Sequence, residues 1–107
     1  MDTIYNKLIR DNIPEFIRGH GKTPVVRVLD DSDYIAALNE KLHEEVAEYM
    51  ADNSIEELCD ILEVVYAIAV AKGHSASEIN ALRTNKNTKN GAFEKKLFLE
   101  KVVDKID

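Results

Sequence analysis

Residues 44–60, EEVAEYMADNSIEELCD, decide the fold, because they join two helical patterns through a short turn of helix-capping residues. The turn is Asp52-Asn53-Ser54, and Ser54 with Glu57 three places later has the form of a capping box that opens a second helix. So short a connection places two helices side by side in opposite directions. The stretch therefore predicts a helical hairpin.

The helix before the turn is expected to be amphipathic. Asp30, Asp31 and Ser32 provide N-cap chemistry at its start, and its pattern continues to about residue 51. Its apolar residues recur at spacings of three and four and form one stripe, which consists of Ile35, Leu38, Leu42, Val46 and Tyr49. This stripe is the face that should pack against the second helix.

The second helix is predicted to end near Gly73, and its residues 61–71 are apolar almost all round, interrupted only by Glu63. A helix of this kind must be covered on more than one side. Because so small a chain has few helices to spare, we expect a homodimer or higher homo-oligomer in which second helices build a bundle of about four. Cys59 is expected to be a small core residue.

The flanking segments predict three smaller elements and a loop. A brief helix is expected over about residues 14–18, and the β-branched residues 23–29 predict a strand. A third helix should begin with the capping box of Ser75 and Glu78 and fade before a polar loop at 85–91. The tail, residues 93–99, could pair as a strand with 24–29, although helix competes there. The expected fold is mainly α with a small N- and C-terminal β element.

The composition limits the classes of protein. A chain of 107 residues suits one domain over residues 1–107, and 45% hydrophobic with 32% charged residues is typical of a folded globular protein. A net charge of −6 argues against binding of nucleic acid polymers. We find no membrane span and no secretion signal in the sequence, and one cysteine fits a reducing compartment, so the expected location is the cytoplasm.

Four acidic residues stand out because the hairpin brings them together. Glu48 and Glu57 lie close to the turn on either side, and Glu45 and Asp60 form the next layer. An offset of three residues is a rise of about 4.5 Å along a helix, so the four carboxylates could surround one or two hard cations. Without a cation, ionised carboxylates on a packed face are costly.

Each acidic residue also has a simpler structural explanation. Glu57 could do no more than close the capping box of Ser54, and acidic residues near a helix start are favoured by the helix dipole. Glu44, Glu45 and Glu48 could form a solvated helical face. The alignment of four acidic residues across the hairpin favours the metal site over these explanations taken together.

The order of the motifs adds a family resemblance. Residues 44–48 followed by 57–60 form the pattern E-E-x-x-E then E-x-x-D, which resembles the all-α NTP pyrophosphatases, the superfamily of MazG and of phosphoribosyl-ATP pyrophosphohydrolase. The opening KLIRDNIP, residues 7–14, is similar to a subgroup described as phosphoribosyl-ATP pyrophosphohydrolase-like or as house-cleaning enzymes. Gly91-Ala92-Phe93 resembles that subgroup's Gly-Gly-Phe.

The resemblance implies a MazG-like bundle and hydrolysis of a nucleoside triphosphate between its α and β phosphates. It implies magnesium, with manganese as the alternative, held by Glu45, Glu48, Glu57 and Asp60. Glu44 and Glu45 would be the catalytic residues, with Glu44 orienting or deprotonating the attacking water. The cations available for the substrate phosphates are Lys7, Arg10, Lys86 and Lys89. Two alternatives stay open: hydrolysis of phosphoribosyl-ATP, and a non-catalytic nucleotide-sensing or dimerisation module.

Overall fold

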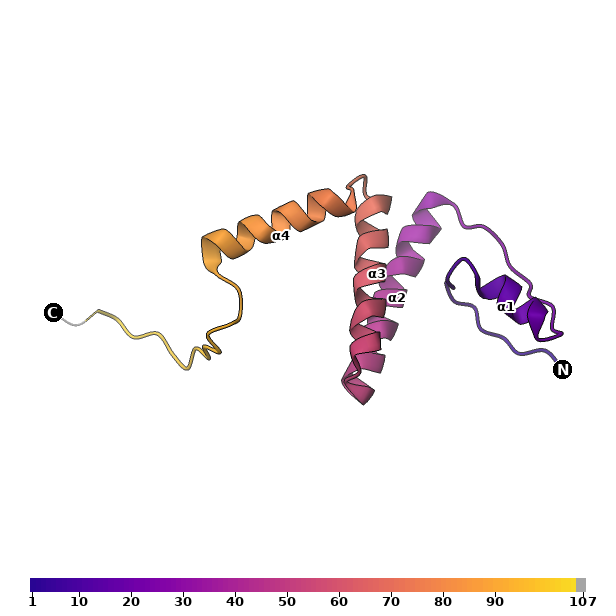
Figure 1. The fold of residues 1–107 in the computed structure, drawn as a ribbon, viewed down its shortest axis with the longest axis horizontal. Helices are drawn as coiled ribbons and strands as arrows, with labels where there is room; N and C mark the ends of the chain where they lie inside the picture. Colours follow the sequence, from indigo (N-terminus) through magenta and orange to yellow (C-terminus); the bar gives the residue numbers. More distant parts are fainter. Residues whose placement is uncertain (106–107) are drawn as a thin grey trace.

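The computed structural model describes residues 1–105, which form four helices. They are α1 (Ile13–Gly19), α2 (Asp31–Asp52), α3 (Ile55–Ala71) and α4 (Ala76–Asn90). The molecule is elongated, with extents of 74 × 32 × 21 Å, and the first and last described segments lie at opposite ends of it (Figure 1). The mainly helical fold predicted from the sequence is confirmed. Over the described chain, no helix has both the length and the apolar character needed to cross a membrane.

The hairpin of α2 and α3 is the centre of the molecule, and Figure 1 shows the two helices side by side. Asp30 caps α2 by accepting a hydrogen bond from the Asp33 backbone N–H at 2.8 Å. Asn53 ends the helix in the left-handed conformation with φ 56°, and Ser54 starts α3 at once. Both helix boundaries and the turn therefore agree with the sequence prediction.

Helix α4 begins as predicted, because Ser75 and Glu78 form a complete capping box. Tyr66 of α3 fixes its start by donating a hydrogen bond from Oη to Asn80 Oδ1 at 3.1 Å. The predicted loop at 85–91 was wrong, since α4 continues to Asn90. The segment is polar but contains no glycine or proline before Gly91, whose N–H bonds to the Asn87 carbonyl at 2.8 Å and closes the last turn.

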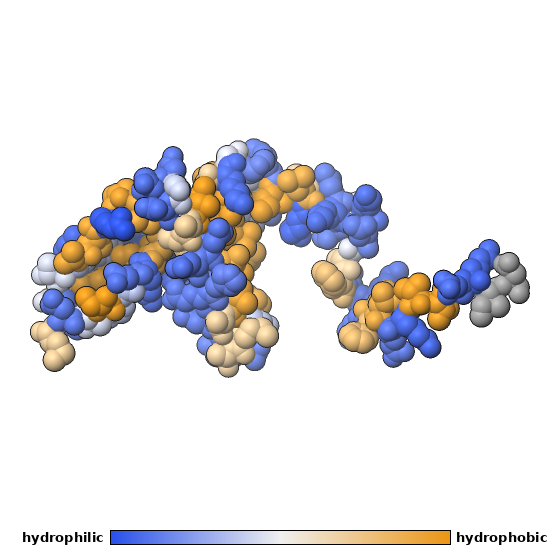
Figure 2. Space-filling model, turned by 180° about the vertical axis from the view of Figure 1, so that it is seen from behind, coloured by the Kyte–Doolittle hydropathy of each residue, from blue (hydrophilic) through white to orange (hydrophobic). Residues whose placement is uncertain are grey.

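The core of one chain is small. Its buried apolar residues are Leu38, Val64 and Ala69, and they lie between α2 and α3. Large apolar side chains of α3 remain exposed, among them Ile55, Leu62 and Val70. Figure 2 shows hydrophobic surface along the hairpin and again on the C-terminal tail. The expectation that one partner helix cannot cover α3 therefore agrees with the exposure of its side chains.

Cys59 was wrongly predicted to lie in the core, because it is exposed on α3. An apolar pattern that continues all round a helix does not say which of its sides the chain itself covers. The single partner helix α2 leaves the side that carries Cys59 open to solvent.

The predicted β element does not form within residues 1–105. Residues 23–29 connect α1 to α2 without strand pairing, and residues 93–99 form a turn followed by an irregular tail. A strand needs a neighbour to receive its backbone hydrogen bonds. Here the two segments lie on opposite sides of the hairpin (Figure 1), so neither can supply that neighbour to the other. The short helix predicted at about 14–18 is present as α1.

Candidate metal centre

Three of the four predicted metal ligands come together across the hairpin. Glu45 of α2 and Glu57 and Asp60 of α3 each offer a carboxylate oxygen, and these oxygens lie within 4.8 Å of one another. Oxygens that share one magnesium ion at about 2.1 Å are at most about 4.2 Å apart, so small side-chain rotations would close the set. All-oxygen donors suit a hard cation such as magnesium or manganese.

The start of α3 leaves the Glu57 side chain free for this cluster. Ser54 Oγ accepts a hydrogen bond from the Glu57 N–H at 3.3 Å, which is half of the predicted capping box. The other half is taken by Asp52, whose Oδ1 accepts from the Ser54 N–H at 2.9 Å. In α4, by contrast, the Glu78 side chain completes its own box. The Glu57 carboxylate therefore takes no part in capping α3, and capping does not explain why an acidic residue stands at this position.

The cluster is electrostatically incomplete. Glu45 is only 6% exposed, and its Oε2 and the Oε2 of Glu57 are buried without a hydrogen-bond partner. Burial, reinforced by the charge of Glu48, raises the pKa of Glu57 to about 7. Buried polar groups are normally paired, so two unpartnered carboxylate oxygens in one acidic cluster are a feature that a cation would satisfy.

Two cations reach the cluster from elsewhere in the chain. Arg10 Nη2 donates to Asp60 Oδ1 at 2.7 Å, and Lys7 Nζ lies 3.3 Å from Glu44 Oε1. The segment before α1 therefore crosses the hairpin and places one positive charge on each of its helices. Lys7 and Arg10 thus lie beside the acidic residues, and about half of each side chain is exposed.

Lys41 is a neighbour of the cluster that the sequence analysis missed. Its Nζ lies 3.3 Å from Glu45 Oε1 and 3.5 Å from Glu44 Oε2, and its side chain is only 18% exposed. The available signal was its spacing of three and four residues before the two glutamates, which puts all three on one side of a helix. Lys41 and Lys7 together hold Glu44 beside the cluster rather than inside it.

The remaining predicted site residues differ in their placement. Glu48 is exposed, but it is close enough to Glu57 for its charge to raise the pKa of that residue, so it lies at the rim of the cluster. Lys86 and Lys89 are exposed on α4, which leads away from the hairpin (Figure 1). Within the described chain, no ion pair joins either lysine to the acidic cluster.

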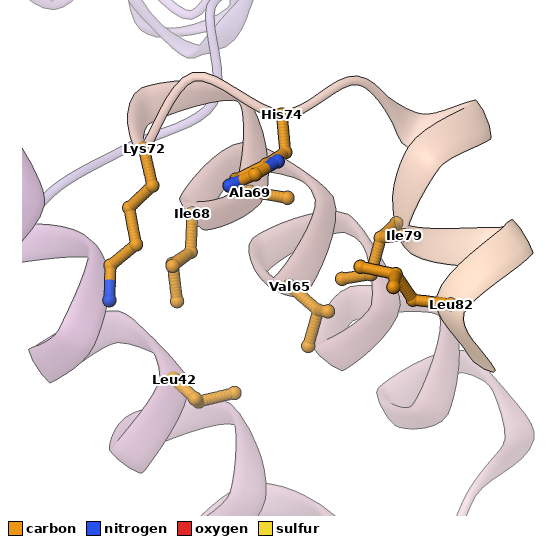
Figure 3. Close-up of a pocket in the computed structure, with 8 residues that line it drawn as sticks. All are labelled: Leu42, Val65, Ile68, Ala69, Lys72, His74, Ile79 and Leu82. Atoms are coloured by element: carbon orange, nitrogen blue, oxygen red, sulfur yellow. The ribbon is translucent and has the colours of Figure 1, made fainter. Parts of the chain in front are cut away.

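A separate apolar pocket lies where α4 leaves the hairpin. Its volume is about 340 Å³, and Figure 3 shows side chains of α2, α3 and α4 around it. The lining residues are Leu42, Val65, Ile68, Ala69, Lys72, His74, Ile79 and Leu82. None of the clustered carboxylates lines this pocket, and the His74 Nδ1 is paired with Glu78 Oε2 at 3.0 Å. The pocket is therefore separate from the acidic site.

Comparison with known proteins gives one partial match. Over 45 residues the chain is 60% identical to an uncharacterized protein of Mycolicibacterium smegmatis, and this stretch is 42% of the chain and 46% of that protein. The chain thus spans about half the length of the curated relative it matches. No protein-family model and no solved structure matches the chain. The chemistry of the site therefore has to be argued from the residues that form it.

Proposed function

We propose that this protein is a magnesium-dependent nucleotide pyrophosphohydrolase that cleaves a nucleoside triphosphate between its α and β phosphates. The products would be the nucleoside monophosphate and pyrophosphate. The resemblance of the acidic motifs to the all-α NTP pyrophosphatases supplies the reaction, and the acidic cluster of the hairpin supports it. Non-canonical nucleotides are the proposed substrates, in keeping with the house-cleaning subgroup that the first residues resemble.

One observation carries this proposal. The Oε2 atoms of Glu45 and Glu57 are buried and unpartnered in a cluster that also contains Asp60. A chain that only needed a stable hairpin would gain more from apolar side chains at these positions. Carboxylate oxygens that are buried there without a hydrogen-bond partner favour a bound cation over a purely structural role.

Each residue near the cluster then has a proposed role. Glu45, Glu57 and Asp60 hold the cation, and Glu48 at the rim is the fourth ligand. Glu44 is kept in place by Lys41, at a distance of 3.5 Å, and accepts a proton from the attacking water. When bound, the cation neutralises phosphate charge and lowers the pKa of water.

The cations from the segment before α1 are proposed to bind the substrate. Lys7 and Arg10 now neutralise Glu44 and Asp60 across the hairpin. These are exposed pairs, which are worth at most about 1 kcal/mol, so a triphosphate could draw both side chains to itself at small cost. Arg10 offers a planar fork of donors that suits two phosphate oxygens. Lys86 and Lys89 could reach this site only from a neighbouring copy.

Association of copies is part of the proposal. The exposed apolar residues of α3, including Ile55, Leu62 and Val70, would be covered by the same helix of a second copy. Such an arrangement is the four-helix bundle that the sequence predicts. It would bring the two acidic clusters into one assembly and close them off from bulk water, where electrostatic interactions are weaker.

The decisive experiment measures pyrophosphate release together with metal binding. A panel of canonical, oxidised and deaminated nucleoside triphosphates, with phosphoribosyl-ATP, would be tested with magnesium and with chelator. Glu57→Gln keeps the shape of the side chain and removes the ligand charge. Glu56→Gln is the matched control, because Glu56 lies in the same first turn of α3 but is exposed. Magnesium affinity would be measured by calorimetry on all three proteins.

The outcomes separate the candidate functions. Magnesium-dependent release that Glu57→Gln loses and Glu56→Gln keeps would support the pyrophosphohydrolase. Metal-dependent nucleotide binding without release from any substrate would replace it with a nucleotide sensor. Absence of calorimetric magnesium binding by the natural protein would contradict the metal centre itself and leave a helical dimerisation module.

A further inference from the structure

Two extended segments of the chain expose apolar side chains and unpaired backbone. The first is residues 24–29, the docking segment, in which Val25 and Val28 are 97% and 98% exposed. The second is residues 97–103, the C-terminal arm, in which the exposed apolar side chains are Leu97, Phe98, Leu99, Val102 and Val103. Within residues 1–105, no backbone hydrogen bond joins either segment to another part of the chain. Extended apolar segments of this kind are sites of association unless they are covered.

The fold prevents the two segments from covering each other in one chain. The docking segment runs between α1 and α2, whereas the arm follows α4 on the far side of the hairpin (Figure 1). Helix α4 is held against α3 by the hydrogen bond between Tyr66 and Asn80. The arm therefore points away from the docking segment of its own chain and is available to a neighbour.

The two segments are complementary in apolar pattern and in charge. Alternate side chains of a strand share a face, so Val25, Arg27 and Leu29 lie together in the docking segment. Phe98, Glu100 and Val102 lie together in the arm. Antiparallel pairing places Arg27 opposite Glu100 and leaves an apolar pair on each side, Val25 with Val102 and Leu29 with Phe98. Opposite charges and β-branched or aromatic pairs are the contacts that stabilise neighbouring strands.

We propose that the C-terminal arm of one copy pairs as an antiparallel strand with the docking segment of a second copy, with Arg27 opposite Glu100. The exchange is reciprocal, so two copies form a closed twofold dimer in which both arms and both docking segments are covered. Pro24 is compatible with this pairing because proline is tolerated as the first residue of a strand. The proposal does not depend on the metal centre or on its chemistry.

A cavity beside the docking segment could accommodate an apolar side chain of the arm. It has a volume of about 340 Å³ and is lined by Leu8, Asp11, Arg27, Val28, Leu29 and Tyr34. In the proposed register Phe98 of the neighbouring arm lies opposite Leu29, at the edge of this cavity. The aromatic ring would then cover Leu8 and Tyr34, which connects the arm of one copy to the segment that carries Lys7 and Arg10 in the other.

Disulfide cross-linking tests the proposed pairing in the whole chain. The natural Cys59 is first replaced by Cys59→Ser, because it is exposed and would react. Val28→Cys and Leu99→Cys, which face each other in the register, are then placed in separate chains, one with a larger affinity tag. The two proteins are mixed and oxidised with copper phenanthroline. Glu94→Cys, in the turn before the arm, replaces Leu99→Cys as the matched control.

We expect a link between the two differently sized chains with Val28→Cys and Leu99→Cys, and little with the Glu94→Cys control. A link no stronger than the control would overturn the proposal. A chain carrying both Val28→Cys and Leu99→Cys decides between pairing within and between copies. Covalent dimers are expected from it; an internal disulfide in a monomer would show that the arm folds back on its own chain instead.

Charge exchange tests the register independently. Arg27→Glu alone, or Glu100→Arg alone, should weaken the dimer roughly tenfold in sedimentation experiments, because two like-charge pairs replace two opposite pairs. The combination of Arg27→Glu with Glu100→Arg should return the dissociation constant to within roughly threefold of the natural protein. Failure of the combined variant to recover would contradict the pairing of these two residues.

Discussion

Arg10 Nη2 and Asp60 Oδ1 are 2.7 Å apart although 50 residues separate them in the sequence. This is the shortest ion pair in the described chain, and it joins the segment before α1 to a proposed metal ligand on α3. The guanidinium lies on one side of the acidic cluster, against Asp60. The proposed binding of metal and of substrate would therefore be coupled to the position of the N-terminal segment through this contact.

Removal of the Arg10 side chain should strengthen magnesium binding and slow pyrophosphate release. Arg10→Ala frees Asp60 Oδ1 and removes a positive charge, so we expect magnesium to bind up to about fivefold more tightly in calorimetry. Pyrophosphate release should fall about tenfold in kcat/KM, because a charge-assisted hydrogen bond to phosphate is lost. Arg18→Ala, on the exposed surface of α1, is the control. Weaker magnesium binding by Arg10→Ala would contradict the competition.

The proposed metal ligands should differ in how much each contributes to magnesium affinity. Glu45→Gln changes the residue that is only 6% exposed, whereas Glu48→Gln changes a side chain at the exposed rim. A buried ligand interacts through a lower dielectric, so Glu45→Gln should lose more magnesium affinity, by about tenfold or more relative to Glu48→Gln. Calorimetric titration of both variants checks this order. Equal losses would place Glu48 inside the cluster.

The stability of the metal-free protein should depend on the protonation of Glu57. Its pKa is about 7 in the folded chain, against a usual value of 4.5. Between these values the folded state keeps a proton that the unfolded state releases, so stability decreases as the pH rises. The melting temperature should therefore fall more steeply from about pH 5 to about pH 8 in the natural protein than in Glu57→Gln. Magnesium should reverse most of this loss at the higher pH.

Parallel slopes of melting temperature against pH in the two proteins would contradict this prediction. The other titrating groups are common to both proteins, so the difference between the two curves isolates Glu57. Glu56→Gln should follow the natural protein throughout, because its side chain lies outside the cluster. The measurement needs chelator in every sample, since trace magnesium would remove the effect.

Variants of the two serine caps should lower stability alike but differ in their effect on magnesium binding. Ser54→Ala and Ser75→Ala each remove a side chain that accepts from the first turn of a helix, and each should cost about 1 kcal/mol in chemical unfolding. Only Ser54→Ala loosens the turn that carries Glu57, so only this variant should weaken magnesium binding. Equal magnesium affinity in the two variants would show that the cap does not position Glu57.

The hairpin could be predicted because its signals are local. Asp30, Ser54 and Ser75 are all caps in the structure, and each is recognisable from its own residue type and the few residues that follow. The grouping of Glu45, Glu57 and Asp60 followed from helix periodicity and the length of the turn. Where local geometry determines the outcome, the sequence was sufficient.

The errors have two physical origins. The strand at 23–29 needed a partner outside its own sequence, and exposure of Cys59 depended on which sides of α3 the chain covers. The helix at 85–90 was missed because polarity alone does not end a helix. Lys41 was missed because an ion pair at helical spacing is common on ordinary surfaces. Non-local contacts decide the first two cases, whereas the last two are local features whose sequence signal is weak.

The small core has a consequence for the behaviour of the chain at low concentration. The apolar residues buried within one copy are Leu38, Val64 and Ala69. Burial of each of these side chains stabilises the folded chain by only about 2 kcal/mol. The ordering of a chain this long opposes folding with a far larger entropy. We therefore expect folding to be linked to association by mass action, so that the melting temperature rises with protein concentration. In a cell, the amount of this protein would then set how much of it is folded.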